Sequence, residues 1–353
     1  MEFSDLLGYR PRLEATIRAQ LGRERRRITP VFRPYLDADT EFTLRGGKRF
    51  RALLLLAGYW IATGRDPSPV LPAAAALEHF QSWMLIHDDI IDHADTRRGG
   101  PTIHRTFERA HATARRLGAA EPYGLGVGIT LGDLNEPFTV GALLEARAPT
   151  ERRLAALAEY VRMTRETAYG QLLDIQNGAT PVEEVREDDV LRVHALKSAF
   201  YTVSSPLRIG AILGGARPGL LRDLEAFGLD VGVAFQLRDD VLGTGFDSGG
   251  AGKSANDLIE GKRTLLVVRA WAAADAAGRA AISAVLNVPS APPAAVDAAR
   301  EVIRATGSLG YSEKRIAQLS RRACQRIERS RAVRAAAKPL LLEICDRLVF
   351  RNV

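Results

Sequence analysis

Residues 76–92 read ALEHFQSWMLIHDDIID, and this stretch decides the fold class. Its apolar side chains recur at spacings of three and four, which predicts a helix with one buried face. The helix would end in acids, with Asp88 and Asp92 one turn apart on one face and Asp89 about 100° round. Like charges at this spacing repel each other, so a bound divalent cation is one interpretation and a solvated acidic turn is the other.

The rest of the chain follows the same helical pattern. Ala, Leu and Arg are frequent and strict alternation is scarce, so we predict an all-α fold. No composition shift or internal repeat marks a boundary, and residues 1–353 are expected to form a single helical domain. Predicted helix breaks fall at Gly64–Pro67, Gly99–Pro101, Pro149, Asn177–Gly178, Gly214–Gly215, Ser248–Gly252 and Pro289–Pro293.

Composition narrows the classes of partner and compartment. The net charge of +7 suits an anionic partner, such as a phosphorylated small molecule, a membrane surface or nucleic acid. Residues 1–10 do not resemble a signal peptide, and the longest apolar run, Ala52–Ala62, is too short to span a bilayer. Cys324 and Cys345 form no C-x-x-C pair. We therefore expect a cytoplasmic protein with no transmembrane segment.

A second acidic pair, Asp239–Asp240, lies in the apolar helical stretch FQLRDDVL. Two carboxylate-bearing helices facing one cavity would suit Mg²⁺ ions shared with a diphosphate. Arg97–Arg98, just after the first acids, would suit the same anion because a guanidinium binds phosphate oxygens as a fork. A solvated turn is again the alternative for the second pair taken alone.

Six segments in order resemble the trans-isoprenyl diphosphate synthases. The D-D-x-x-D motif of that family stands at Asp88–Asp92, and the resemblance runs from about Gly46 to Leu266. The other five segments are G-G-K-x-x-R at Gly46–Arg51, G-Q-x-x-D at Gly170–Asp174, K-T as Lys197–Ser198, F-Q-x-x-D-D at Phe235–Asp240, and G-K-x-x-x-D-L-x-x-x-K-x-T-L at Gly252–Leu265.

The resemblance implies an isoprenoid-synthase bundle of helices around a deep central cavity. It also implies roles for individual residues. It places Asp88, Asp89, Asp92, Lys197, Asp239 and Asp240 in the catalytic site. Up to three Mg²⁺ ions would be bound by Asp88, Asp92 and Asp239. Isopentenyl diphosphate would be held by Lys48, Arg51, Gln81 and Arg98. The allylic diphosphate would be held by Arg97, Lys197, Lys253 and Lys262, with Ser198 and Gln236 nearby.

The activity implied is head-to-tail condensation of these two diphosphates by a homodimer. Trp83 and Met84 precede Asp88 by about 6–7.5 Å along the helix, where bulky groups in the family limit the growing chain. A product of C15–C20 follows, with geranylgeranyl diphosphate favoured. Ordinary core packing of these two side chains is the alternative.

The sequence departs from the family pattern at several positions. Gly243 stands where the second motif usually ends in Asp, with Asp247 as a possible substitute. Arg238 replaces a neutral residue and would either weaken a cation site or add a phosphate clamp. Gln81 replaces a frequent histidine, and Asn135 and Pro137 are unexpected.

Other functions fit less well. A class I terpene cyclase would need a serine where Glu260 stands, and a non-catalytic subunit of a heteromeric synthase would be expected to lose its acids or clamps. Residues 248–254 resemble the end of a P-loop, but a preceding strand is missing. Arginine runs at 23–27 and 315–334 allow a weak contact with anionic lipid, whereas nucleic-acid binding lacks interleaved aromatics.

Overall fold

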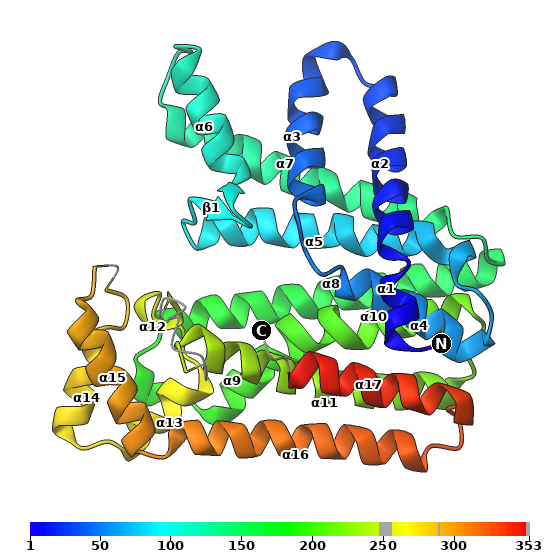
Figure 1. The fold of residues 1–353 in the computed structure, drawn as a ribbon. Helices are drawn as coiled ribbons and strands as arrows, with labels where there is room; N and C mark the ends of the chain where they lie inside the picture. The colour runs from blue at the N-terminus through cyan, green and yellow to red at the C-terminus, as the bar shows by residue number, and fades with distance from the viewer. Residues whose placement is uncertain (247–255, 289, 351–353) are drawn as a thin grey trace. The chain divides into compact units, whose positions relative to one another are not determined.

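The computed structural model describes residues 1–246, 256–288 and 290–350. Over these ranges the chain is helical except for loops and one ribbon of two-residue strands, β1 (Thr96–Arg97) and β2 (Gly100–Pro101) (Figure 1). The predicted all-α class is confirmed. Lys253, Asp247 and the predicted break at Ser248–Gly252 lie outside the described residues.

The chain divides into two compact units. Residues 3–159 and 206–216 form the first, and residues 160–205 with the described part of 217–353 form the second. The single domain expected from the sequence stays a prediction. The first unit contains α1 (Phe3–Leu7), α2 (Arg10–Arg27), η1 (Pro30–Phe32), α3 (Arg33–Leu44), α4 (Phe50–Thr63), η2 (Ser68–Val70), α5 (Leu71–Ile91), α6 (Ile103–Thr113), α7 (Ala120–Leu144) and nearly all of α10 (Ser205–Leu213).

The second unit begins within α8 (Thr150–Ala179), a helix shared along the chain by both units. Its other elements are η3 (Val182–Glu184), α9 (Glu187–Val193), the π-helix η4 (His194–Ser204), α11 (Pro218–Gly243), α12 (Asn256–Ile259), α13 (Leu265–Ala273), α14 (Ala276–Ser283), α15 (Pro293–Ala305), α16 (Ser308–Arg329), η5 (Ala335–Ala337) and α17 (Lys338–Val349).

Most predicted breaks coincide with observed helix ends. Helix α4 stops before Gly64, whose left-handed backbone (φ 72°) caps it, and α8 begins directly after Pro149. The break at Asn177–Gly178 was placed slightly early, because α8 continues to Ala179. A glycine in the last turn destabilises a helix only slightly. Gly178 therefore indicates that the helix end is near, but the helix can continue past it.

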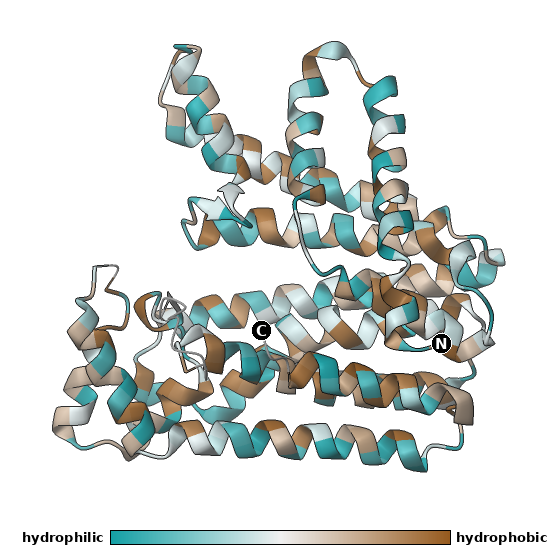
Figure 2. Ribbon diagram, viewed as in Figure 1, coloured by the Kyte–Doolittle hydropathy of each residue, from teal (hydrophilic) through white to brown (hydrophobic). Residues whose placement is uncertain are grey.

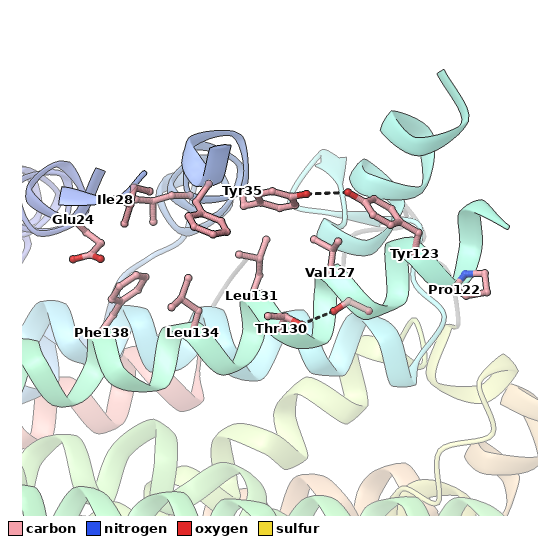
Figure 3. Close-up of a pocket in the computed structure, with 13 residues that line it drawn as sticks. Glu24, Ile28, Tyr35, Pro122, Tyr123, Val127, Thr130, Leu131, Leu134 and Phe138 are labelled. Atoms are coloured by element: carbon pink, nitrogen blue, oxygen red, sulfur yellow. Dashed lines mark hydrogen bonds between the residues drawn. The ribbon is translucent and has the colours of Figure 1, made fainter. Parts of the chain in front are cut away.

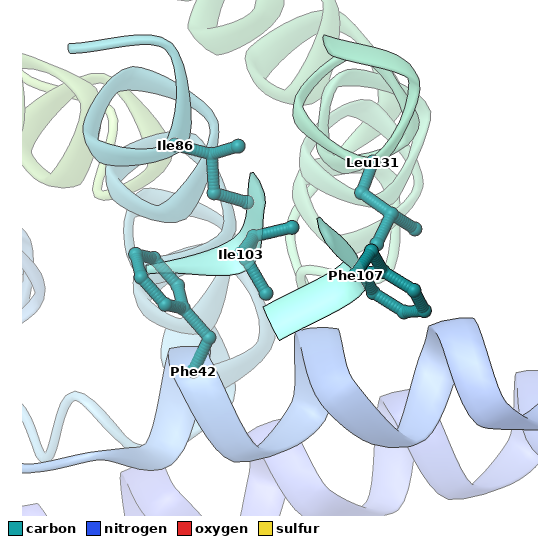
Figure 4. Packing of buried hydrophobic residues seen from close by; sticks show 5 residues of the cluster. All are labelled: Phe42, Ile86, Ile103, Phe107 and Leu131. Atoms are coloured by element: carbon teal, nitrogen blue, oxygen red, sulfur yellow. The ribbon is translucent and has the colours of Figure 1, made fainter. Parts of the chain in front are cut away.

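A cluster of apolar side chains fixes the acidic end of α5. Phe42 from α3, Ile86 from α5, Ile103 and Phe107 from α6, and Leu131 from α7 are all buried against one another (Figure 4). Ile86 lies one turn or less before Asp88 and Asp89. Packing of four helices around this position therefore limits the movement of the acids.

In the second unit, α16 packs along α11, which carries Asp239 and Asp240. The buried residues Ile316, Leu319 and Ala323 recur along α16 at the helical period. Figure 2 shows the resulting alternation of apolar and polar bands on α16. The amphipathic pattern accounts for the contact, since one face of α16 is buried and the opposite face is arginine-rich.

The two thiols, far apart in sequence, are neighbours in the second unit. Cys324 on α16 is half-buried and Cys345 on α17 is buried. A hydrogen bond with Cys345 lowers the pKa of Cys324. Both are free thiols. Within the described residues, no helix has the length and hydropathy needed to cross a bilayer.

The unexpected Asn135 has a partner in the core of the first unit. Its amide Nδ2 donates to Oδ1 of Asp39 on α3 at 2.7 Å, and both side chains are fully buried. Burial raises the pKa of Asp39 to about 7, while the hydrogen bond from Asn135 acts in the opposite direction. Asn135 therefore links α3 to α7 through a carboxyl group that stays protonated to near-neutral pH.

We expect Asp39→Asn to change how stability depends on pH. The folded wild type keeps a proton on Asp39 up to about pH 7, whereas the unfolded chain loses it near 3.8. Unfolding therefore releases a proton in this window, and the contribution of Asp39 to the free energy of unfolding falls as pH rises, then levels above pH 7. As the pH rises from about 4 to about 7, the free energy of unfolding of Asp39→Asn should increase relative to that of wild type by up to about 1.4 kcal/mol per pH unit.

Chemical denaturation of both proteins at a series of pH values from 4 to 8 measures this gain. A stability difference that stays constant with pH would contradict the assignment of a raised pKa to Asp39.

Candidate active site

Arginine and amide side chains from three segments meet in the first unit. Gln81 of α5, with its amide oxygen facing them, accepts from Arg98 Nη2 at 3.0 Å and from Arg51 Nη1 at 3.3 Å. Arg98 follows the β1 strand, and Arg51 lies in the first turn of α4. The exposed Lys48 lies three residues before Arg51. This cationic cluster (Lys48, Arg51, Gln81 and Arg98) has the chemistry of a diphosphate-binding site.

The backbone around the cluster is fixed by Arg45. Its Nη1 donates to the carbonyls of Arg97 at 3.0 Å and Pro101 at 2.8 Å, which ties the β1–β2 ribbon to the end of α3. Arg98 in turn donates from Nη1 to the Arg45 carbonyl at 3.2 Å. The ribbon therefore presents Arg97 and Arg98 from a braced turn.

The acids at the end of α5 differ in their surroundings. Asp89 is fully buried and accepts from Arg97 Nε at 2.6 Å, while Asp88 is half-buried and Asp92 is exposed. Arg97 Nη2 also lies 3.8 Å from Asp88 Oδ2. Burial raises the pKa of Asp89, and Arg97 acts against this shift. The structure thus makes Asp89 the partner of Arg97, with Asp88 and Asp92 nearer to solvent.

Lys197 is held by an irregular helix in the second unit. It lies on the π-helix His194–Ser204, and its Nζ is 2.7 Å from Oδ2 of Asp174 on α8. A Cβ atom on Gly170 would overlap the backbone of Lys197, so glycine is what lets α8 approach the π-helix. The G-Q-x-x-D segment therefore has two visible tasks: Gly170 admits the π-helix and Asp174 orients Lys197. π-Helical turns are frequent at functional sites.

A hydrogen-bonded chain connects the π-helix to α11. Ser198 Oγ donates to Gln236 Oε1 at 2.9 Å, and Gln236 Nε2 donates to Asp240 Oδ1 at 3.2 Å. The other oxygen of Asp240 lies 2.9 Å from His194 Nε2, with both side chains buried. Asp240 is therefore enclosed by this chain, whereas Asp239 is only half-buried.

Arg238 has a structural role. Its Nη1 and Nη2 each lie 2.7 Å from the carboxylate of Glu313 on α16, and its Nε donates to the Val349 carbonyl at 3.3 Å. This fork joins α11 to α16 and α17. From the sequence, Arg238 was expected either to weaken a cation site or to add a phosphate clamp. The observed bonds instead give Arg238 a role in helix packing.

Gly243 makes space for another acid. A Cβ atom built there would overlap Oδ2 of Asp257, so the absence of a side chain admits that carboxylate beside the end of α11. Oδ1 of Asp257 lies 2.9 Å from Lys262 Nζ, and Glu260 is at the same distance from Lys262. Burial disfavours the charged form of Lys262, but the two carboxylates prevail and raise its pKa. Asp257 thus brings a carboxylate to position 243 although the residue there is glycine.

Sequence reasoning missed His194 and Arg49, and passed over Asp174 within its own motif. His194 lies three residues before Lys197, but on the π-helix the two side chains contact acids of different helices, α11 and α8. Arg49 stands between the two recognised cations of its motif. Neither position signalled its buried acidic partner, which comes from a distant part of the chain.

Asp88, Asp92 and Asp239 are the candidate ligands of a divalent cation. No three His, Cys, Asp or Glu side chains among the described residues are arranged to hold an ion by themselves. The half-buried and exposed carboxylates of Asp88, Asp92 and Asp239 still offer the hard oxygen ligands that Mg²⁺ takes when water and phosphate complete its shell. The chemistry of these residues therefore fits Mg²⁺ bound together with a diphosphate.

A separate apolar cavity of about 620 Å³ lies between the α2–α3 turn and α7 (Figure 3). Its walls include Ile28, Leu131, Leu134 and Phe138. Tyr35 and Tyr123 also line it, and their hydroxyls are hydrogen-bonded at 3.0 Å. None of the site residues predicted from the sequence lines this cavity.

Comparisons with known proteins identify the family of this chain. The family model for polyprenyl synthetase matches residues 34–303. The chain is 31% identical over 326 residues to a geranylfarnesyl diphosphate synthase of Natronomonas pharaonis, covering 87% of each chain. It is 32% identical over 273 residues to a geranylgeranyl diphosphate synthase of Mycobacterium tuberculosis, covering 77% of this chain and 71% of the relative.

A solved structure is similar over its whole length. It is geranylgeranyl pyrophosphate synthase from Corynebacterium glutamicum, complexed with isoprenyl diphosphate and magnesium, with a TM-score of 0.89, 31% identity and 100% of both chains covered. The isoprenoid-synthase fold expected from the resemblance is thereby confirmed. The chain belongs to the polyprenyl synthetase family, the trans-isoprenyl diphosphate synthases, and is a prenyltransferase.

Proposed function

We propose that this protein joins isopentenyl diphosphate to an allylic diphosphate in a Mg²⁺-dependent head-to-tail condensation and releases a short-chain prenyl diphosphate and pyrophosphate. The observation that carries the proposal is the cationic cluster, in which Gln81 contacts both Arg51 and Arg98. Gln81 and the acids at Asp88 and Asp92 belong to the same helix, so one rigid element carries both a phosphate-binding group and candidate metal ligands.

Each substrate has its own set of residues in this proposal. Isopentenyl diphosphate is bound by the cationic cluster, and the allylic diphosphate by a second set of cations. Those cations are Arg97, Lys197, Lys253 and Lys262, with Ser198 and Gln236 beside them. The ion pairs of Arg97 with Asp89 and of Lys197 with Asp174 support these roles, because they hold each cation in one orientation before substrate binds.

Asp88, Asp92 and Asp239 hold the magnesium, and up to three ions fit the family pattern. Magnesium, when bound, supplies positive charge to the departing pyrophosphate. Asp89 and Asp240 act through other side chains and do not bind the metal themselves. Asp89 orients Arg97, and Asp240 orients Gln236. These two acids are positioning residues.

The reaction needs no protein nucleophile. The carbon–oxygen bond of the allylic diphosphate breaks, and the double bond of isopentenyl diphosphate attacks the resulting allylic carbocation. A proton then leaves the new chain, with the departing pyrophosphate as its acceptor. Lys197, Lys262 and Arg97 stabilise the negative charge that develops on the leaving group, and this preorganised charge lowers the barrier.

The product in this proposal has 15–20 carbons, with geranylgeranyl diphosphate favoured. Trp83 supports a short product because its ring is fixed on both sides. It makes edge-on contacts with Phe80, at 5.7 Å between ring centroids, and with His87, at 6.4 Å. A bulky ring held this way five residues before Asp88 would limit the length of a growing prenyl tail.

A terpene cyclase, which ionises a single diphosphate, would have no use for the cationic cluster. The match to the polyprenyl synthetase family also supports a synthase over a cyclase.

The proposed assembly is a homodimer, supported by one face of α8. Five large apolar side chains there are 48–63% exposed: Leu154, Val161, Tyr169, Leu172 and Ile175. Their spacing places them on one side of the helix, with Arg165 among them, and an exposed apolar stripe is typical of an interface.

The first prediction from the proposed function concerns turnover. Purified protein given isopentenyl diphosphate, a C5, C10 or C15 allylic starter and Mg²⁺ should release pyrophosphate and longer prenyl diphosphates, sized by mass spectrometry. Chelation should abolish turnover and added Mg²⁺ should restore it. Asp88→Ala and Asp239→Ala should each lower kcat at least about a hundredfold. Asp37→Ala and Asp297→Ala, which remove exposed acids on each unit, are the controls.

Near-normal activity in both Asp88→Ala and Asp239→Ala would refute the metal assignment. No turnover with any starter would refute the proposed function.

The second prediction concerns product length. Trp83→Ala should extend the product by at least one isoprene unit, because the ring that limits the tail is removed. Trp271→Ala, on α13 in the second unit, is the matched control and should leave the product distribution unchanged. An unchanged distribution in Trp83→Ala would reject the role of Trp83 as a floor.

The third prediction concerns assembly. Light scattering coupled to size-exclusion chromatography should give twice the chain mass of 38.4 kDa. Leu172→Glu places a charge in the apolar stripe and should shift the mass toward the monomer, whereas Glu301→Lys, which exchanges one exposed charge for another on α15, should not. A monomeric wild type would overturn the dimer.

A further inference from the structure

Arg49 lies in the loop of residues 46–49, directly before α4, but its side chain does not face solvent. Its side chain is 1% exposed, although the neighbouring Lys48 is exposed. The backbone at Arg49 is left-handed (φ 57°), as it is at Gly46 (φ 57°) and Gly47 (φ 100°). A left-handed conformation is unfavourable for a residue with a Cβ atom, so other contacts must hold Arg49 in it.

Those contacts come from three helices. Arg49 Nη1 donates to Glu78 Oε2 on α5 at 2.8 Å and to the Thr43 carbonyl on α3 at 2.9 Å. Its Nη2 donates to the Leu44 carbonyl at 3.2 Å, and its Nε lies 3.5 Å from Glu14 on α2. Glu78 is also 1% exposed, so this is a fully buried ion pair with further hydrogen bonds around it.

Helix α5 holds the loop at a second point one turn later. Glu78 and Gln81 are three residues apart and share a face of α5. Glu78 holds Arg49, and Gln81 accepts from Arg51. The segment from Arg49 to Arg51 is therefore fixed to one rigid helix at both ends, with Lys48 directly before it.

We propose that Arg49 is a positioning residue for isopentenyl diphosphate, whose buried pair with Glu78 holds the left-handed loop that presents Lys48 and Arg51 to the diphosphate. The inference rests on the proposed function and deepens it, because it adds a buried pair on which the binding of one of the two substrates depends. Neither Arg49 nor Glu78 touches the substrate in this arrangement.

The geometry requires arginine. The guanidinium reaches two backbone carbonyls and a carboxylate at once, from two nitrogens fixed in one plane. A lysine at position 49 keeps the charge for Glu78 but lacks the planar fork, so the carbonyls of Thr43 and Leu44 lose their donor. The loop would then sample other conformations, and binding of the diphosphate would have to order it.

The test separates the two substrates. Arg49→Lys and Glu78→Gln are compared with wild type for the KM of isopentenyl diphosphate and the KM of the allylic diphosphate. We expect the first KM to rise about tenfold in each variant, a loss of about 1.4 kcal/mol of binding free energy. The second KM should stay within about twofold of wild type, because the residues that bind the allylic diphosphate keep their partners. The effects should also be non-additive in the double variant.

A matched pair controls for lost stability. Arg208 and Glu159 form another largely buried ion pair in the first unit, with Nε–Oε1 and Nη2–Oε2 distances of 2.9 Å. Arg208→Lys and Glu159→Gln should lower the melting temperature without changing the ratio of the two KM values. The milder Glu78→Gln keeps an acceptor oxygen and answers the question if Arg49→Lys does not fold.

Three outcomes would overturn the inference: an unchanged KM for isopentenyl diphosphate in a folded variant, an equal rise in both KM values, or the same ratio change in the control pair. A wild type without turnover is a different result, and it would reject the proposed function instead.

Discussion

Helix α5 carries acids at two fully buried positions, and each is neutralised by an arginine from a neighbouring segment. Glu78 is paired with Arg49 and Asp89 with Arg97. A buried carboxylate without a partner costs several kcal/mol, so these pairs fix where the loop before α4 and the β1–β2 ribbon must lie. Lys48, Arg97 and Arg98, which are proposed to bind substrate, project from those two segments.

This arrangement accounts for the ordering of charge along α5. The acids that are deep in the core pair with arginines, and the acids nearer to solvent, Asp88 and Asp92, remain at the helix end. A site that must bind both metal ions and diphosphates needs both signs of charge within a small volume. The buried pair of Arg49 and Glu78 uses no group that is proposed to meet substrate, whereas Arg97, paired with Asp89, is held in place for the allylic diphosphate.

In the second unit, a cation proposed to bind substrate is likewise paired with an acid, and it lies on the π-helix. Lys197 would repel other cations brought to a diphosphate, and it is held by Asp174 across a close contact that only Gly170 permits. The π-helix that carries Lys197 also places His194 against Asp240. Irregular backbone is retained here where regular α-helix would alter the angular positions of these side chains.

Sequence alone predicted the helical class and several helix ends, because these depend on local spacing and on residue type. It did not predict the partner of Arg49, the outward bonds of Arg238 or the place of Asp257 beside Gly243, because each depends on residues 14 to 111 positions away that approach only after folding. Gly243 illustrates the difference. Compared position by position, it is a lost acid, whereas in three dimensions the missing side chain leaves room for the carboxylate of Asp257. A motif therefore records which residues a chain has, and the packing around it decides which charge each position presents.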